Sequence, residues 1–148
     1  MPKKEEKQVF AVDFDGTMVS HEFPLIGKDI RAVPVLRKLV ENGHKIILYT
    51  MRSDKKEVKS KDYNIHQKGG DYLTQAVNWC KANKIPLYGI QQNPTQKNWT
   101  DSPKCYANNY IDDAAIGCPL KIDKKISSRP FVDWVKMEKL LRDAGYIK

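Results

Sequence analysis

Two aspartates stand directly after a short apolar run near the N-terminus, in the order Asp13-Phe14-Asp15-Gly16-Thr17. A carboxylate such as that of Asp13 can attack phosphorus and form an aspartyl-phosphate, which is a recognised form of covalent catalysis. Asp15, two positions later, could protonate the leaving oxygen and then activate the hydrolytic water. Gly16 permits a tight turn that keeps Asp15 directed at the same site. The motif therefore predicts attack on a phosphate ester, with Asp13 and Asp15 as catalytic residues.

A second polar group, Thr50-Met51-Arg52, follows another apolar run. The Thr50 hydroxyl and the backbone N–H groups around Met51 are expected to bind phosphoryl oxygens. Lys104 would add a fixed positive charge there, because phosphoryl transfer depends on electrostatic stabilisation. Lys97 is a rival for this role, although its distance from the later acidic pair fits less well. Arg52 is a weaker candidate, for contact with the leaving group of the substrate.

An acidic pair, Asp112-Asp113, completes the set of candidate site residues. Mg²⁺ prefers oxygen ligands and commonly takes one or two carboxylates together with phosphate oxygens and water. Asp13 and Asp112 are the expected carboxylate ligands, and the bound metal would offset the repulsion between nucleophile and phosphate. Asp113 and Thr17 are expected to hold these ligands in position without binding the metal themselves.

The elements that must position these residues can be inferred from apolar periodicity. Strand patterns alternate with helix patterns, and the helix that includes Pro34 is expected to begin near that proline. Alternation of this kind predicts an α/β fold, specifically a three-layer α/β/α Rossmann-like arrangement with a central parallel sheet and helices on both faces. Ligands bind beyond the carboxyl ends of such strands, where the polar groups stand. The predicted strands cover 8–12, 44–49, 86–90 and 109–111, and the predicted helices cover 30–42, 72–83 and 131–144.

The chain length of 148 residues suits one domain, 1–148, without a large cap. Residues 1–7 are charged and are expected to be flexible. Residues 53–70 form a polar, lysine-rich stretch without periodicity, which is interpreted as a loop that could act as a partial lid.

Composition and charge indicate where in the cell the protein is expected and which kinds of ligand it attracts. No apolar run approaches the roughly 20 residues of a membrane span, and the N-terminus lacks an apolar signal segment, so a cytoplasmic location is expected. The three cysteines, Cys80, Cys105 and Cys118, are interpreted as reduced thiols. The net charge of +8 attracts anions in general, including phosphate esters and nucleic acid, without choosing among them.

The same residues resemble the motifs of the haloacid dehalogenase (HAD) superfamily. Asp13, Asp15 and Thr17 look like its first motif, Thr50 like its second, and Lys104 with Asp112-Asp113 like its third and fourth. More closely, the chain is similar to small, uncharacterised HAD hydrolases of bacteria and phages, through the segments 47–52, 101–107 and 110–113. The resemblance runs from about Val9 to Gly117.

This resemblance implies a Mg²⁺-dependent phosphatase in which the backbone carbonyl of Asp15 also binds the metal. Many HAD phosphatases carry a cap domain, but the segments between the motifs here leave room for little more than a flap. A capless, open site suits a phosphorylated small molecule, the phosphorylated end of a macromolecule, or closure by a second subunit of a homo-oligomer.

Several alternatives remain beside phosphate monoester hydrolysis. A phosphotransferase could use the same site. A dehalogenase is disfavoured because it needs neither Asp15 nor the metal pair, and a phospho-receiver is disfavoured because the predicted third strand ends in Gln91-Gln92-Asn93-Pro94, without an acid. A non-catalytic module that binds anions or nucleic acid is favoured only by net charge, because the three tryptophans are not interleaved with basic residues.

Overall fold

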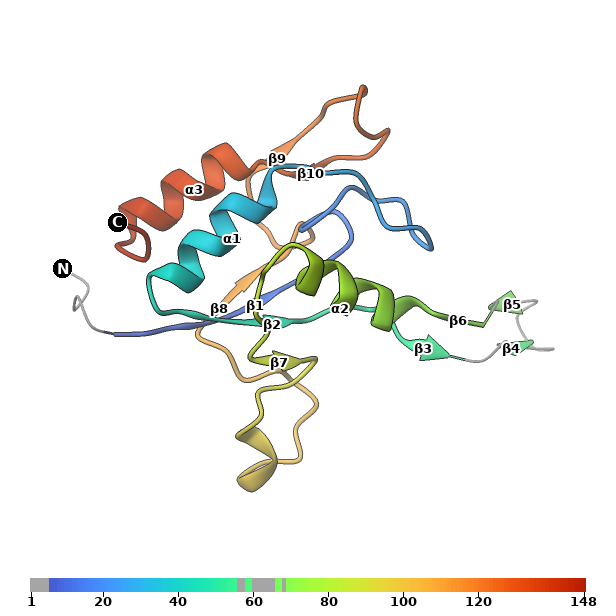
Figure 1. The fold of residues 1–148 in the computed structure, drawn as a ribbon, viewed down its shortest axis with the longest axis horizontal. Coiled ribbons are helices and arrows are strands. Elements are labelled where there is room, and N and C mark those ends of the chain that lie inside the picture. The colour runs from blue at the N-terminus through green and yellow to red at the C-terminus, as the bar shows by residue number, and fades with distance from the viewer. Residues whose placement is uncertain (1–5, 56–57, 60–65, 68) are drawn as a thin grey trace.

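A four-stranded parallel sheet forms the centre of the computed structural model, which describes residues 6–55, 58–59, 66–67 and 69–148 (Figure 1). The strands lie in the order β7-β2-β1-β8, and every pairing is parallel. The predicted α/β class with a parallel sheet is confirmed. The expected third strand, 86–90, is shorter than predicted. The strands are β1 (Val9–Val12), β2 (Lys45–Leu48), β7 (Gly89–Ile90) and β8 (Asn109–Ile111).

One face of this sheet is covered by helices. Phe10 and Val12 of β1 belong to a buried cluster that includes residues of α1 (Ala32–Glu41), α2 (Tyr72–Ala82) and α3 (Trp134–Asp143). The helices lie on the same side of the sheet in Figure 1. Within the described part of the chain, no helix has the length and apolar character needed to cross a bilayer.

The opposite face is covered differently. Ala11 and Ile47, which alternate with the residues of the helical face, pack with Cys105 in a separate buried cluster. Cys105 belongs to the long connection between β7 and β8, whose regular structure is the short 3₁₀ helix η1 (Gln96–Asn98). Since the three described α-helices share one cluster, the predicted three-layer arrangement with helices on both faces is not confirmed.

The first helix begins two residues earlier than Pro34, at Ala32. Pro34 is tolerated in the first turn because the N–H group that it lacks would have no partner within the helix. The helix ends at Glu41, and Gly43 follows in the left-handed conformation, with φ of 88°. The Gly43 and His44 N–H groups donate to the carbonyls of Val40 and Leu39, which is the Schellman arrangement and confirms the predicted end.

The last helix is shorter than predicted, because Phe131–Val132 forms strand β10 instead of the first helical turn. Strand β10 pairs antiparallel with β9 (Leu120–Lys121). Asp133 then caps α3, and its carboxylate accepts hydrogen bonds from the N–H groups of Val135 and Lys136. The apolar pattern from 131 onward therefore covered two elements rather than one.

The segment 53–70 is not a plain polar loop, which corrects the sequence-based expectation. It contains an antiparallel pairing of β3 (Asp54–Lys55) with β6 (Gly70–Asp71) and another of β4 (Val58–Lys59) with β5 (His66–Gln67). Asp54 also accepts hydrogen bonds from the N–H and hydroxyl groups of Thr74 in α2. The expected lid role and the expected flexibility of 1–7 fall partly on residues outside those described, and both stay predictions.

All three cysteines are free thiols, as predicted. Cys80 lies in the cluster beneath the helices and Cys105 in the cluster on the other face. Burial raises the pKa of the Cys80 thiol to about 12, so this side chain packs as a small, uncharged group.

The indole N–H group of Trp134 ties α3 to the loop after β1, since it donates to the Thr17 carbonyl at 2.7 Å. Trp134→Phe should lower the free energy of unfolding by about 1–3 kcal/mol, because it leaves a buried carbonyl without this donor. Trp99→Phe is the matched control: its side chain is 62% exposed, so a change within about 0.5 kcal/mol is expected. Urea unfolding of both variants measures these changes. Equal losses of unfolding free energy in the two variants would contradict a stabilising role for the hydrogen bond from Trp134 to Thr17.

Candidate active site

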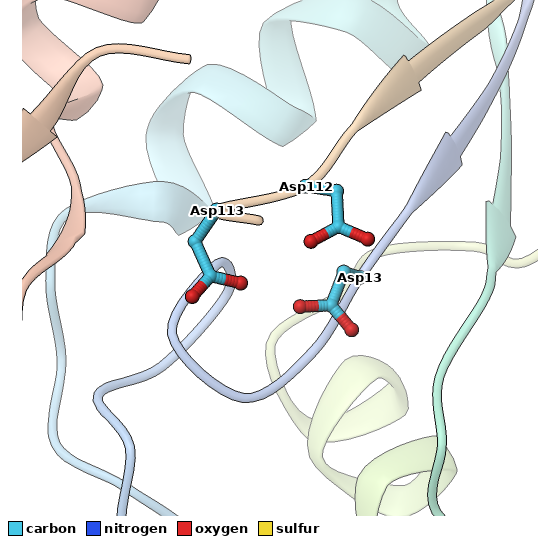
Figure 2. Close-up of side chains that lie close together, drawn as sticks. All are labelled: Asp13, Asp112 and Asp113. Atoms are coloured by element: carbon cyan, nitrogen blue, oxygen red, sulfur yellow. The ribbon is translucent and has the colours of Figure 1, made fainter. Parts of the chain in front are cut away.

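Three carboxylates converge where β1 and β8 end. Asp13 follows β1 directly, and Asp112 and Asp113 follow β8. One oxygen from each of these side chains lies within 4.8 Å of the others (Figure 2). The chain leaves β1 toward β2 on one side, whereas β8 pairs with β1 on the other side. This is a topological switch point, the position at which open α/β sheets bind ligands. The structure thus brings together three of the four acidic residues predicted for the site, and Asp15 is not among them.

The environment of Asp13 disfavours its charged form. Burial, a hydrogen bond with Asp113 and the charge of Asp112 together raise the pKa of Asp13 to about 8. The Thr17 hydroxyl, 3.0 Å from Asp13 Oδ2, and the Phe14 N–H group act in the opposite direction but do not prevail. A hard divalent cation among these oxygens would relieve the same repulsion that a proton relieves. The donor set therefore fits such an ion.

Asp113 is held by two side chains. His21 Nε2 lies 2.8 Å from Asp113 Oδ2, and the Thr17 hydroxyl lies 3.2 Å from Oδ1 while accepting the Asp113 N–H. Burial alone would raise the pKa of Asp113, but the hydrogen bond from His21, followed by those involving Asp13 and Thr17, lowers it. The supporting roles expected of Thr17 and Asp113 stay predictions.

His21 was not predicted, and only the structure shows its place. Gly16, with φ of 83°, lets the loop after β1 turn back so that His21 reaches Asp113. A Cβ atom on Gly16 would lie 2.1 Å from His21 Nε2, so a larger residue cannot occupy this position without displacing the histidine.

Asp15 is not part of the carboxylate cluster of Asp13, Asp112 and Asp113; it forms an ion pair with Arg52 instead. The guanidinium donates from Nε to Asp15 Oδ2 and from Nη2 to Oδ1, both at 2.8 Å, which is a bidentate ion pair. Its remaining N–H groups donate to the carbonyls of Pro24, Leu25 and Tyr72. The Arg52 residue is 2% exposed. It therefore joins the loop after β1, the 24–25 segment and the start of α2.

This placement bears on two predicted roles. Every N–H group of Arg52 is engaged within the protein, which favours a positioning role over direct contact with a substrate. The aromatic rings of Phe14 and Phe23 also lie beside the guanidinium, each with its centroid 5.0 Å from Cζ. Arg52 donates one hydrogen bond to each Asp15 oxygen, so the pair holds the Asp15 carboxylate in one orientation.

The end of β2 is shaped by Gln91, another residue that the sequence did not single out. Its side-chain amide accepts the Thr50 N–H at 2.8 Å and donates to the Thr50 carbonyl at 2.6 Å. The Thr50 hydroxyl accepts the Arg52 N–H at 3.1 Å, and its own proton is left for a second partner. Met51 is 97% exposed at the same strand end. Their phosphate-binding roles remain predictions.

Lys104 lies away from the contacts that the structure gives to Asp13. Its ammonium is 6.0 Å from the centroid of the Tyr110 ring. The groups that shift the pKa of Asp13 are Asp112, Asp113, Thr17 and the Phe14 N–H, and Lys104 is not among them. Lys97 is exposed in η1 and lines a hollow with Gln92 and Ser102. A phosphate-binding role for either lysine therefore stays a prediction.

Comparison with known proteins gives a structural likeness. No protein-family model and no curated protein matches the chain. A conserved protein from Bacteroides thetaiotaomicron has a similar solved structure, with a TM-score of 0.67 and 28% sequence identity. The match covers 94% of this chain and 93% of that chain. The likeness thus extends over nearly the whole of both proteins.

The raised pKa of Asp13 predicts how stability depends on pH without metal. As pH rises from about 4 toward about 8, the unfolded chain ionises Asp13 while the folded protein retains its proton, so folding is progressively disfavoured. Asp13→Asn removes this effect. In the presence of a chelator, its melting temperature should exceed that of the parent by several degrees at pH 8 and by much less at pH 5, since about 1 kcal/mol corresponds to roughly 2–4 °C in a domain of this size.

Thermal unfolding at the two pH values measures this difference. Asp101→Asn, which removes an exposed carboxylate, serves as the control and should follow the parent protein. A melting-temperature difference between Asp13→Asn and the parent that is the same at both pH values would contradict the assignment.

The pairing of Asp15 with Arg52 predicts strong energetic coupling. Arg52→Met should cost about 3–5 kcal/mol, because it leaves a carboxylate without its partner in a largely buried position. Adding Asp15→Asn should recover at least about 1 kcal/mol of this loss, as measured by urea unfolding. Arg142→Met, which breaks the exposed pair with Glu138, should cost no more than about 1 kcal/mol. Additive losses in the double variant would disprove the coupling.

Proposed function

We propose that this protein is a Mg²⁺-dependent phosphohydrolase that uses Asp13 as a covalent nucleophile toward a phosphate monoester. The observation that carries the proposal is the convergence of the Asp13, Asp112 and Asp113 carboxylates within 4.8 Å at the ends of β1 and β8. Carboxylate oxygens are the ligands that Mg²⁺ prefers. A nucleophile that is also a metal ligand is useful with an anionic substrate, because the metal offsets the repulsion between them.

Asp13 and Asp112 would hold the ion, and Asp113 is within reach of the same position. His21 and Thr17 fix the Asp113 carboxylate through hydrogen bonds of 2.8 and 3.2 Å, so its orientation is set before any ligand binds. The backbone carbonyl of Asp15 is a further proposed ligand, by resemblance to HAD phosphatases.

The proposed reaction has two steps. An Asp13 oxygen forms a bond to phosphorus while the bond from phosphorus to the leaving oxygen breaks, and the leaving oxygen takes a proton from Asp15. Water then attacks the phosphorus of the aspartyl-phosphate while the bond from the Asp13 oxygen to phosphorus breaks, Asp15 accepts the water's proton, and inorganic phosphate and the free Asp13 carboxylate are released. Arg52, which donates one hydrogen bond to each Asp15 oxygen, would orient Asp15 for these proton transfers. Thr50 and the backbone at Met51 would bind the phosphoryl oxygens.

The sheet order and the motif positions support a Rossmann-like, HAD-type assignment. Under it, the 91–108 connection stands where a three-layer arrangement would carry a second set of helices. The site has no large cap in its described surroundings, which suits a phosphorylated small molecule or the phosphorylated end of a macromolecule. Three free thiols support a reducing compartment such as the cytoplasm.

Hydrolysis of p-nitrophenyl phosphate tests the proposal directly. The parent protein should release p-nitrophenol with Mg²⁺ and lose this activity when the metal is chelated. Asp13→Asn should lower kcat by at least about 10⁴-fold, because the amide is neutral and a poor nucleophile. Asp101→Asn is the matched control and should retain activity. Appreciable Mg²⁺-dependent turnover by pure Asp13→Asn protein would rule out this mechanism.

A further inference from the structure

Three exposed aromatic side chains line one hollow with Lys104, two of them on the connection between β7 and β8 and the third, Tyr110, in β8 itself. Trp99 is 62% exposed, Tyr106 50% and Tyr110 39%. With Lys104 they line a hollow of about 310 Å³, here called the aromatic hollow. Large aromatic surfaces exposed together are typical of binding sites, because leaving them in water has a free-energy cost.

The rings meet at their edges instead of stacking face to face. Trp99 and Tyr106 meet edge to face, with centroids 5.3 Å apart and an interplanar angle of 87°. Tyr110 meets Tyr49 in the same way at 5.8 Å. In an edge-to-face pair, one ring offers only its edge and the other only one face. Because Trp99 and Tyr106 are also at least half exposed, these two rings present surface on which a planar ligand could stack, whereas the Lys104 ammonium lies over the Tyr110 ring.

A buried amide holds the backbone of this region in place. Gln96 is 1% exposed, and its Oε1 accepts the N–H groups of Asn93 and Tyr106, both at 2.9 Å. Its Nε2 donates to the carbonyls of Lys104 at 3.0 Å and Ser102 at 3.3 Å. All four hydrogen-bonding positions of the amide are engaged. The backbone of Ser102, Lys104 and Tyr106 is therefore preorganised at the hollow, which lowers the entropic cost of binding.

We propose that the aromatic hollow binds unpaired bases of single-stranded nucleic acid. Bases would stack on Trp99 and Tyr106, and the Lys104 ammonium would pair with a backbone phosphate. Stacking on aromatic side chains combined with positive charge is the general mode of single-strand recognition. The protein's net charge of +8 favours a polyanion over a neutral peptide, which could use the rings but not the lysine.

The inference concerns binding and is independent of the proposed hydrolysis. Tyr110 nevertheless stands two residues before Asp112, at the end of the same strand. A nucleic-acid strand bound in the hollow would therefore contact β8, the β-strand that Asp112 and Asp113 of the candidate site follow. Failure of either proposal can be recognised separately, because one is measured by affinity and the other by turnover.

Fluorescence anisotropy of a labelled oligothymidylate of about twelve nucleotides, over a series of salt concentrations, tests the proposal. Trp99→Ala and Tyr106→Ala should each weaken binding by roughly ten-fold or more, since each removes a stacking surface. Lys104→Ala should reduce the slope of log affinity against log salt concentration by about 0.7, the value for one phosphate contact on a single strand.

Matched controls locate the effect. Lys81→Ala removes the same charge from α2, beside β7 at the opposite edge of the sheet, and should leave the slope near that of the parent. Intrinsic fluorescence offers a second readout, because Trp99 is exposed whereas Trp79 is half-buried and Trp134 is 2% exposed. Quenching by the oligonucleotide should disappear in Trp99→Phe.

Two results would overturn the proposal. One is the absence of oligonucleotide binding by the parent protein at low salt. The other is binding that Trp99→Ala, Tyr106→Ala and Lys104→Ala leave unchanged, which would place the nucleic acid elsewhere on the basic surface. The three substituted side chains are exposed, so the variants should fold, and circular dichroism would verify this.

Discussion

Three carboxylates repel one another at the ends of β1 and β8, and the surrounding chain is arranged around that repulsion. Burial, the hydrogen bond with Asp113 and the charge of Asp112 raise the pKa of Asp13 to about 8, and a proton on Asp13 relieves the repulsion in the absence of a cation. Thr17 bridges Asp13 and Asp113, and His21 holds Asp113 from the other side. The indole of Trp134 in turn fixes the Thr17 carbonyl. Packing of α3 is thereby linked to the geometry of the acidic cluster.

Much of the fold could be predicted from the sequence, because apolar periodicity reports which side of an element is buried. The strands around Phe10 and Ile46 and the helix end at Gly43 follow from such local signals. The rest depends on tertiary pairing. Phe131 and Val132 continue an apolar pattern that also suits a helix, but pairing with β9 makes them a strand. The connection that covers the second face is organised by the buried amide of Gln96, which has no periodic signal.

The candidate site could be predicted in outline for a similar reason. Strand ends that carry polar residues meet at one edge of a parallel sheet, so Asp13 and Asp112 could be placed together. Their neighbours could not. Arg52 was interpreted as a contact for the substrate, yet its guanidinium is buried and faces Asp15, because the 24–25 carbonyls and the start of α2 close around it. Contacts of this kind join distant segments and leave no pattern in the sequence.

The exposed side chain of Met51 has a consequence for oxidation chemistry. Met51 is 97% exposed beside the predicted phosphate-binding threonine, whereas Met18 is fully buried and Met137 is 8% exposed. A thioether in water is converted by peroxide to a polar sulfoxide far faster than one within a core. Peroxide should therefore oxidise Met51, next to the candidate site, while Met18 and Met137 stay reduced. A ligand seated over Thr50 would shield that sulfur, so the mass of the Met51 peptide would report occupancy without any measurement of turnover.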